Sequence, residues 1–167
     1  GYTLKLIVKT MHGLEDVLAE ELKQLGADQI APMRRGVSCE GDLKLMYQVN
    51  LWCRTALRVM VPVHTFTAQT EAQVYEQALK YEWHNVISND KTFAIDHVVF
   101  SNHFKHSGYL ALKTKDAIVD QIRSVTGSRP NVNVQDPDIL INLHVANDVV
   151  TLSIDSSGEP LNRRGYR

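Results

Sequence analysis

The first 66 residues carry apolar side chains with two different periods. At 2–8 these side chains occupy every second position, which predicts a strand with one buried face. At 14–25 they recur at helical spacing, and Gly26 stands where a left-handed residue commonly ends a helix. The chain is therefore expected to open with a strand and an amphipathic helix.

The following residues repeat this alternation of strand and helix. Two short strands are predicted at 29–33 and 36–42, and Asp42 is predicted to cap a second helix. A further strand is predicted at 56–63. The order strand–helix–strand–strand–helix–strand is the split βαβ arrangement of ferredoxin-like domains. We therefore expect residues 1–66 to form a ferredoxin-like βαββαβ domain.

Residues 67–156 predict a second domain of the α/β type, which makes the fold class of the whole chain α+β. The expected elements are a helix opened by the capping box TEAQ at 70–73, a central strand at 92–100, a helix at 108–126 ended by Gly127, and a hairpin of strands at 139–145 and 149–155. The remaining segment, 157–167, has no strand or helix pattern and is expected to be a linker.

Charge is distributed unevenly along a chain whose formal net charge is only −1. Residues 101–135 contain five Lys or Arg against two Asp, and residues 159–167 contain three Arg against one Glu. Residues 1–100 contain ten basic against twelve acidic side chains. The chain is not uniformly basic, but its C-terminal third predicts a local patch that attracts an anionic partner such as RNA.

Motifs for catalysis or cofactor binding are missing from the sequence. It contains no P-loop, no GxGxxG after a strand, no HExxH, and no glycine-rich turn that would hold the cofactor of a Rossmann-type methyltransferase. His103 and His106 flank Lys105, whose charge would repel a metal cation, so no metal site is expected. We therefore predict no catalytic residues in this chain.

The two cysteines and the lack of long apolar runs bear on the compartment. Cys39 and Cys53 form no CxxC motif and are interpreted as small core residues, which favours a reducing cytoplasm. No apolar run approaches the ~20 residues that a membrane span needs. A cytoplasmic protein without a membrane partner is expected.

The best candidates for RNA contact lie in the loops around the predicted long helix. Lys105 precedes the helix, whereas Arg129 and Asn131 follow it, and none has an acidic neighbour in sequence. Lys115 lies beside the apolar stripe of the helix. On the polar face, Lys113 is expected to pair with Asp116, and Asp120 with Arg123, at i,i+3 spacing.

Several segments resemble the THUMP region of bacterial 23S rRNA guanine-N2 methyltransferases. They are KTKDAIVD, RPNVNVQDPDILINLHV and LSIDSSGEPLNRRGYR, and, upstream, GLEDVLAEELKQLGA and GVSCEGDLKLMYQVNLWCRTALRVMVPV. The resemblance covers essentially the whole chain and is collinear. It implies a ferredoxin-like domain, a THUMP domain and then one or two methyltransferase domains that depend on S-adenosylmethionine.

This resemblance implies that the chain is an RNA-binding fragment of an enzyme. Its domains would be 1–66 (ferredoxin-like), 67–156 (THUMP) and 157–167, a linker stump to an absent methyltransferase domain acting in cis. The fragment alone would not be an enzyme and would hold no cofactor, and its partner would be 23S rRNA. The residues predicted to contact RNA are Lys105, Lys115, Arg129, Asn131 and Arg164.

Two other functions fit the same observations. The module could belong to a tRNA-modifying enzyme, since THUMP domains occur in enzymes that act on several RNAs. Alternatively, the basic C-terminal third could dock an acidic protein and have no role in RNA binding.

Overall fold

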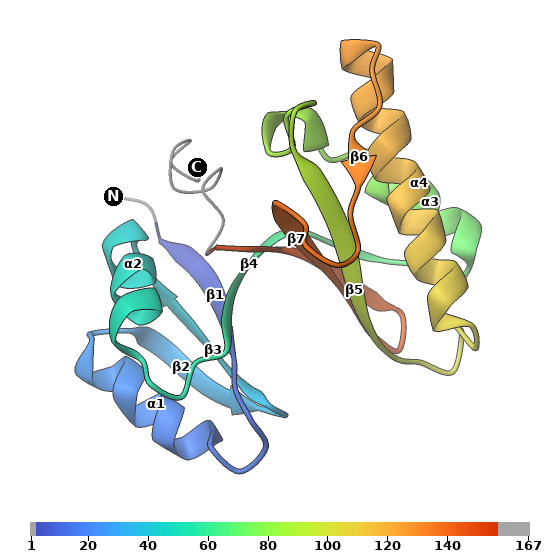
Figure 1. The fold of residues 1–167 in the computed structure, drawn as a ribbon. Coiled ribbons are helices and arrows are strands. Elements are labelled where there is room, and N and C mark those ends of the chain that lie inside the picture. Colours follow the sequence, from blue (N-terminus) through green and yellow to red (C-terminus); the bar gives the residue numbers. More distant parts are fainter. Residues whose placement is uncertain (1–2, 157–167) are drawn as a thin grey trace. The chain divides into compact units, whose positions relative to one another are not determined.

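The computed structural model describes residues 3–156, which fall into two compact units (Figure 1). Within the described residues, unit 1 contains 3–62 with 155 and 156, and unit 2 contains 63–154. The division lies inside strand β4 (Arg58–Thr67). The domain boundary expected between residues 66 and 67 lies at the end of the same strand and stays a prediction. The expected linker at 157–167 lies outside the described residues.

Unit 1 has the predicted βαββαβ order. Its elements are β1 (Leu4–Lys9), α1 (Glu15–Gln24), β2 (Asp28–Met33), β3 (Gly36–Gly41), α2 (Leu43–Trp52) and the first part of β4. The strands lie in the order β2-β3-β1-β4, and each neighbouring pair is antiparallel. The expectation of an α+β chain with a ferredoxin-like first part is therefore confirmed.

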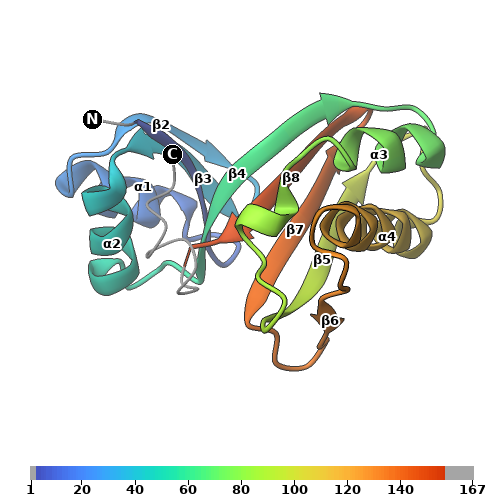
Figure 2. The same cartoon turned by 90° about the horizontal axis from the view of Figure 1, so that it is seen from above.

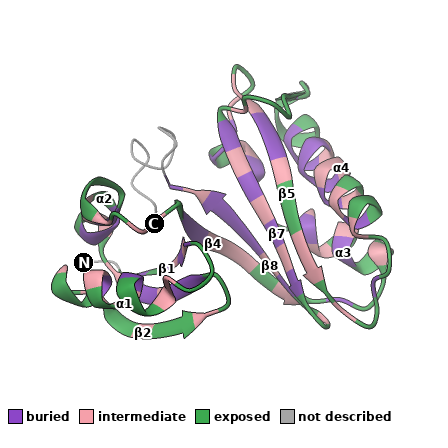
Figure 3. Ribbon diagram, turned by 60° about the horizontal axis from the view of Figure 1, so that its bottom comes forward, coloured by how far each residue is buried: buried purple, intermediate pink, exposed green. Residues whose placement is uncertain are grey.

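The core of unit 1 forms between one face of the sheet and its two helices. Leu4, Leu6 and Val8 alternate along β1 and are buried, as the period-two pattern predicts. Leu18 and Leu22 of α1 are buried four residues apart. Figure 3 shows buried segments of α1 in purple between exposed segments in green. Val17, which the periodic pattern also placed on the buried face, is 50% exposed, because a ten-residue helix buries only a narrow stripe.

Local signals in the sequence explain where the helices begin and end. The carboxylate of Asp42 accepts a hydrogen bond of 2.8 Å from the backbone N–H of Leu45, so it is the predicted cap of α2. Gly26 follows α1 with φ +91°, and Gly127 follows α4 (Ser107–Thr126) with φ +79°. Glycine suits both positions because other residues are strained in the left-handed region.

Unit 2 places two helices on one face of its sheet (Figure 2). Besides α4, its elements are α3 (Glu71–Ala78), the 3-10 turn η1 (Trp83–Asn85), β5 (Thr92–Phe100), β6 (Asn131–Val132), β7 (Ile139–Ala146) and β8 (Val149–Asp155). The strand order is β4-β8-β7-β5-β6. Strand β5 is parallel to β6 and β7, and β7 and β8 form the predicted antiparallel hairpin.

The predicted central strand 92–100 is central only at its start. Strand β6 has two residues, and of the residues of β5 it pairs with Thr92 and Phe93 alone, so only Phe93 has strand partners on both sides. Further along, Asp96, His97 and Phe100 are exposed. The prediction from apolar composition that both faces of this strand are buried is therefore wrong for its second half. The sequence analysis also missed the short strand β6, which lies inside a predicted loop.

Candidate nucleic-acid interface

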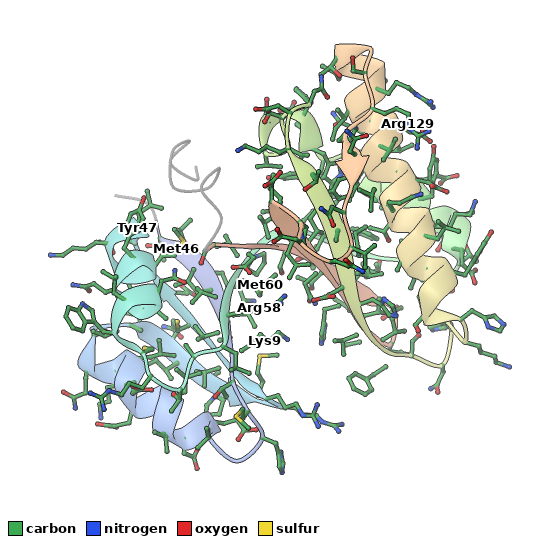
Figure 4. All side chains as sticks on the ribbon, in the orientation of Figure 1. Lys9, Met46, Tyr47, Arg58, Met60 and Arg129 are labelled. Atoms are coloured by element: carbon green, nitrogen blue, oxygen red, sulfur yellow. The ribbon has the colours of Figure 1, made fainter. Side chains whose placement is uncertain are left out.

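Helix α4 separates the predicted RNA contacts into two groups. Lys105 lies just before its first turn, whereas Arg129 and Asn131 follow its last turn. A helix of 20 residues spans about 30 Å. The structure therefore does not bring Lys105 together with Arg129, which is labelled at the far end of α4 in Figure 4.

The loop after α4 holds Arg129 in a defined position. Gly127 turns the chain out of the helix, Pro130 is buried, and Asn131 lies in β6, in register with Thr92 of β5. Arg129 is exposed and makes no ion pair or side-chain hydrogen bond with any residue of the described part of the chain. Its guanidinium group is therefore available to an anionic ligand.

Arg129 lies at an open groove of about 400 Å³ that runs along α4. The groove is lined by Tyr75 of α3, by Lys113, Asp116, Val119, Asp120 and Arg123 of α4, and by Arg129. Three of these side chains are cations and two are carboxylates. The groove therefore carries a small positive excess along one side of the helix.

The two carboxylates of the groove are already engaged by neighbouring groups. Asp120 accepts a hydrogen bond from the hydroxyl of Tyr75, and Arg123 Nη2 lies 3.0 Å from Asp120 Oδ1. The hydrogen bond to Asp120, assisted by burial, raises the pKa of Tyr75. The predicted pairing of Asp120 with Arg123 is confirmed, and Asp120 also ties α3 to α4.

The predicted pairing of Lys113 with Asp116 is wrong. Asp116 pairs with Lys115, whose Nζ lies 3.3 Å from Asp116 Oδ1, rather than with Lys113. Lys113 instead places its Nζ 5.5 Å from the centre of the Tyr109 ring, within the range of a cation–π contact. Lys115 is thus the predicted contact whose charge is already compensated.

The loop before α4 presents Lys105 to solvent. Its neighbour Phe104 is 4% exposed and fixes the loop to unit 2, and the hydroxyl of Ser101 accepts the N–H of His103 at 3.0 Å. Lys105 itself makes no ion pair with a described residue. The fifth predicted contact, Arg164, lies outside the described residues.

Sequence reasoning discounted Lys113 and Arg123 as members of a solvated helix face. The structure places both along the same groove as Arg129. Asn133, in the loop after α4, accepts the backbone N–H groups of Gln135 and Asp136 with its amide oxygen and so stabilises that loop. The sequence did contain a signal for Arg123. It lies one turn before the end of the helix and therefore close to the loop that contains Arg129.

The cysteines do not supply a reactive group. Burial raises the pKa of both thiols to about 11, with smaller contributions from neighbouring Cys53 and Glu40 at Cys39 and from Glu21 at Cys53. The thiolate form is therefore scarce at neutral pH. Within residues 3–156, no cluster of three or more His, Cys, Asp or Glu side chains has a geometry suited to a metal ion. No described helix is both long and apolar enough to span a membrane.

S-adenosylmethionine does not fit the residues of this part of the chain. The connections that lead from a strand to a helix contain one glycine, Gly13, among the described residues. The N–H of Gly13 donates to Glu15 Oε1 at 2.7 Å, so an anion of the protein already occupies that turn. A glycine-rich turn open to a nucleoside cofactor is not formed there.

The antiparallel sheet of unit 1 and the mixed sheet of unit 2, with its cationic groove, define a two-domain α+β protein. A family model described as RlmL ferredoxin-like domain matches residues 5–60, and one described as THUMP domain matches residues 68–155. The second match covers more than half of the chain. The chain therefore belongs to the THUMP domain family and carries an RlmL-type ferredoxin-like domain before the THUMP domain.

Relatives with names and solved structures agree with this assignment. The ribosomal RNA large subunit methyltransferase K/L of Syntrophotalea carbinolica is 38% identical over 164 residues, which make up 98% of this chain and 23% of that protein. A structure described as a predicted N6-adenine-specific DNA methylase from Listeria monocytogenes aligns with a TM-score of 0.79 and 27% identity, over 99% of this chain and 43% of that one.

A more distant structure shares the fold. The crystal structure of a 4-thiouridine synthetase–RNA complex with bound ATP aligns with a TM-score of 0.59 and 13% identity, over 92% of this chain and 41% of that one. In each of these comparisons the chain spans less than half of the longer protein.

Proposed function

We propose that this chain is the RNA-binding part of a ribosomal RNA methyltransferase. In this proposal it positions 23S rRNA so that a guanine reaches a catalytic domain that lies outside the chain and methylates its N2 atom. The observation that carries the proposal is the 38% identity, over 98% of the chain, to a protein named ribosomal RNA large subunit methyltransferase K/L. The THUMP match over 68–155 supports the same conclusion.

The geometry of unit 2 supports a contact with phosphates at the C-terminal end of α4. Arg129 is exposed and without an ionic partner among the described residues, and it shares a groove with Lys113 and Arg123. Arginine suits this role because its planar guanidinium matches a phosphate with two parallel hydrogen bonds. Asn131 lies two residues further along the same loop, where its amide can reach a base or a ribose hydroxyl.

The other three predicted RNA contacts differ in the structural support that they have. Lys105 would form a separate contact at the opposite end of α4, and Arg164 keeps its proposed role without a structural argument. Lys115 is the weakest of the five because its ammonium group is paired with Asp116. The methyl donor, S-adenosylmethionine, and the catalytic groups would belong to the domain outside the chain.

A salt titration tests the proposal. The affinity of residues 1–167 for a hairpin transcribed from 23S rRNA would be measured by fluorescence anisotropy between 0.05 and 0.5 M salt (roughly the range in which such contacts respond). With four or five phosphate contacts, the slope of log K against log[salt] should be about −3 to −4. Absent binding, or a flat response, would refute the RNA role and favour an acidic protein as the partner.

The structural likeness to a 4-thiouridine synthetase solved with RNA keeps one alternative in view, a module that serves a tRNA-modifying enzyme. That function predicts tighter binding to tRNA with a free 3′ end than to the rRNA hairpin. The two transcripts would be compared at equal ionic strength, because phosphate contacts respond to salt whatever the RNA. Preference for the hairpin supports the ribosomal substrate.

A further inference from the structure

Three loops of unit 1 that are distant in sequence lie side by side. They contain residues 9–12, 34–36 and 54–58, and we call them the basic loop cluster. The N–H of Thr10 donates to the carbonyl of Arg35 at 2.9 Å, and the N–H of Leu57 donates to the carbonyl of Lys9 at 2.8 Å. Thr10 Oγ1 donates to the carbonyl of Thr55, at 2.6 Å. Hydrogen bonds to main-chain groups therefore hold the three loops together.

The basic loop cluster contains only positive formal charges. Its cations are Lys9, Arg34, Arg35, Arg54 and Arg58, and it also contains His12 but no Asp or Glu. The four arginines are exposed and Lys9 is half-buried. Although residues 1–100 together carry a net negative charge, the fold concentrates half of their ten basic side chains at these loops.

Two carboxylates that flank these loops, those of Glu15 and Glu21, accept hydrogen bonds from the main chain of the loops. Glu15 accepts the N–H of Gly13 at 2.7 Å and that of Arg35 at 3.1 Å, and its Oε2 lies 3.9 Å from the ring of His12. Glu21 accepts the N–H groups of Arg54 and Thr55, at 3.0 and 3.2 Å, and the hydroxyl of Thr55. Both glutamates thus bond to main chain at the positions where arginine side chains leave it.

Lys9 and Arg58 occupy directly opposed positions on β1 and β4 (Figure 4). Burial lowers the pKa of Lys9. Lys9 has no ion-pair partner among the described residues. Two apolar side chains of the same loops, Met11 and Leu57, are 60% and 63% exposed. This combination of cations and exposed apolar surface is suited to an anionic polymer with stacking bases.

We propose that the basic loop cluster is a second RNA contact, located in the ferredoxin-like unit, that binds backbone phosphates of a structured RNA. The inference rests on the proposed RNA-binding function of the chain. RNA is favoured over an acidic protein because the loops combine exposed arginines, which match phosphates, with the exposed apolar side chains of Met11 and Leu57, and because the proposed function already gives the chain an RNA ligand. Bases or riboses would pack on Met11 and Leu57.

The test neutralises two arginines without disturbing the bonds that order the loops. In Arg35→Gln/Arg54→Gln the hydrogen bonds to Glu15 and Glu21 remain, because they are donated by the backbone. The matched control is Lys23→Gln/Lys44→Gln, which removes two exposed cations from α1 and α2, outside the cluster. Equal melting temperatures of the two variants confirm that both are folded.

Binding of each variant to the 23S rRNA hairpin is then titrated against salt. Loss of two phosphate contacts should make the slope shallower by about 1.4 to 1.8 and weaken binding about 25- to 60-fold at 0.1 M salt, whereas the control should change little. RNA cross-linking followed by peptide mass spectrometry should recover peptides that contain residues of the three loops.

The outcomes separate this inference from the proposed function. If Arg129→Ala weakens binding while Arg35→Gln/Arg54→Gln behaves like its control, the second contact is overturned and the RNA role of unit 2 stands. The cluster would then be left as a surface for an acidic protein. If the unmodified chain binds no RNA, the proposed function fails and this inference fails with it.

Discussion

The two units of this chain bring their cations to the surface in opposite ways. In unit 2 the basic residues are close in sequence, but on α4 they are largely compensated: Arg123 pairs with Asp120 and Lys115 with Asp116. In unit 1 the basic residues are scattered, yet three loops without a single carboxylate bring five of them together. Local charge density in the sequence therefore indicated the cations of unit 2 but not those that the fold brings together in unit 1.

The largest expected effect tests whether the two regions act on one RNA. Arg35→Gln/Arg54→Gln/Arg129→Ala removes three proposed phosphate contacts and should weaken binding roughly 100- to 500-fold at 0.1 M salt. Separate sites contribute additively, so the loss in binding free energy should equal the sum for the two regions measured alone. Anisotropy titrations of the three variants check this. A triple variant no weaker than Arg35→Gln/Arg54→Gln would show that the regions do not bind together.

The single variant Arg129→Ala isolates the contact in unit 2. Loss of one phosphate contact should weaken hairpin binding about five- to eightfold at 0.1 M salt. Thermal unfolding should be unchanged, because the side chain is exposed and bonds to no described residue. An equal loss of stability and binding would instead make Arg129 a structural residue.

The stability of the loops in unit 1 should depend on Glu21. Glu21→Gln weakens three hydrogen bonds made with Arg54 and Thr55, and should lower the free energy of unfolding by about 1–3 kcal/mol. Hydrogen exchange should accelerate at the amides of Arg54 and Thr55. The matched control is Glu20→Gln, whose carboxylate accepts only from the exposed Gln24 side chain among the described residues. Unchanged exchange would mean that Glu21 does not order this loop.

Acid should loosen the same loops. Burial alone would raise the pKa of Glu21, but hydrogen bonds from Thr55 and Arg54 outweigh it and hold that pKa below its ordinary value; backbone hydrogen bonds lower the pKa of Glu15. A lowered pKa in the folded state adds stability above the unfolded pKa, and this stability is lost as the pH falls through the folded value. Melting temperatures should therefore fall on acidification below about pH 4.5. The fall should be smaller in Glu21→Gln.

The smallest expected effect concerns the paired lysine of α4. Lys115→Gln should change RNA affinity less than twofold (roughly the size of an exposed ion-pair effect), because its ammonium group already lies 3.3 Å from Asp116. The measurement is the same hairpin titration. If Lys115→Gln lost as much RNA affinity as Arg129→Ala, RNA would displace Asp116 from Lys115. Ion pairs within the helix would then not predict which cations bind RNA.

Much of the fold could be predicted from local patterns. The caps at Asp42 and Gly127 appear where the sequence placed them, since capping depends on a few adjacent residues. Burial was harder to predict: Val125 lies at the helical spacing of the apolar side chains of α4 but is 56% exposed, whereas Thr114 is fully buried and donates its hydroxyl to the carbonyl of Leu110 at 2.9 Å. A periodic pattern predicts which face of a helix points to the core. It does not predict how wide a part of that face the neighbouring elements cover.

The candidate site could be predicted only in part, because its contacts join distant positions. The loop after α4 was identified from Arg129 and its neighbours, which need no partner elsewhere in the chain. The groove beside it also needs Tyr75, which lies 54 residues before Arg129 and reaches Asp120 through the packing of α3 on α4. No spacing rule connects those residues.

The sequence by itself determined the order of the main helices and strands, the ends of the main helices and the family of the chain, because periodicity, capping and collinear motifs reside in neighbouring residues. Only the tertiary structure decided which charges meet. Lys9, Arg35 and Arg54 come together because antiparallel pairing of β1 with β3 and β4 returns the ends of distant segments to one edge of the sheet. Net charge is a property of composition, whereas a surface potential depends on where the chain brings each charge.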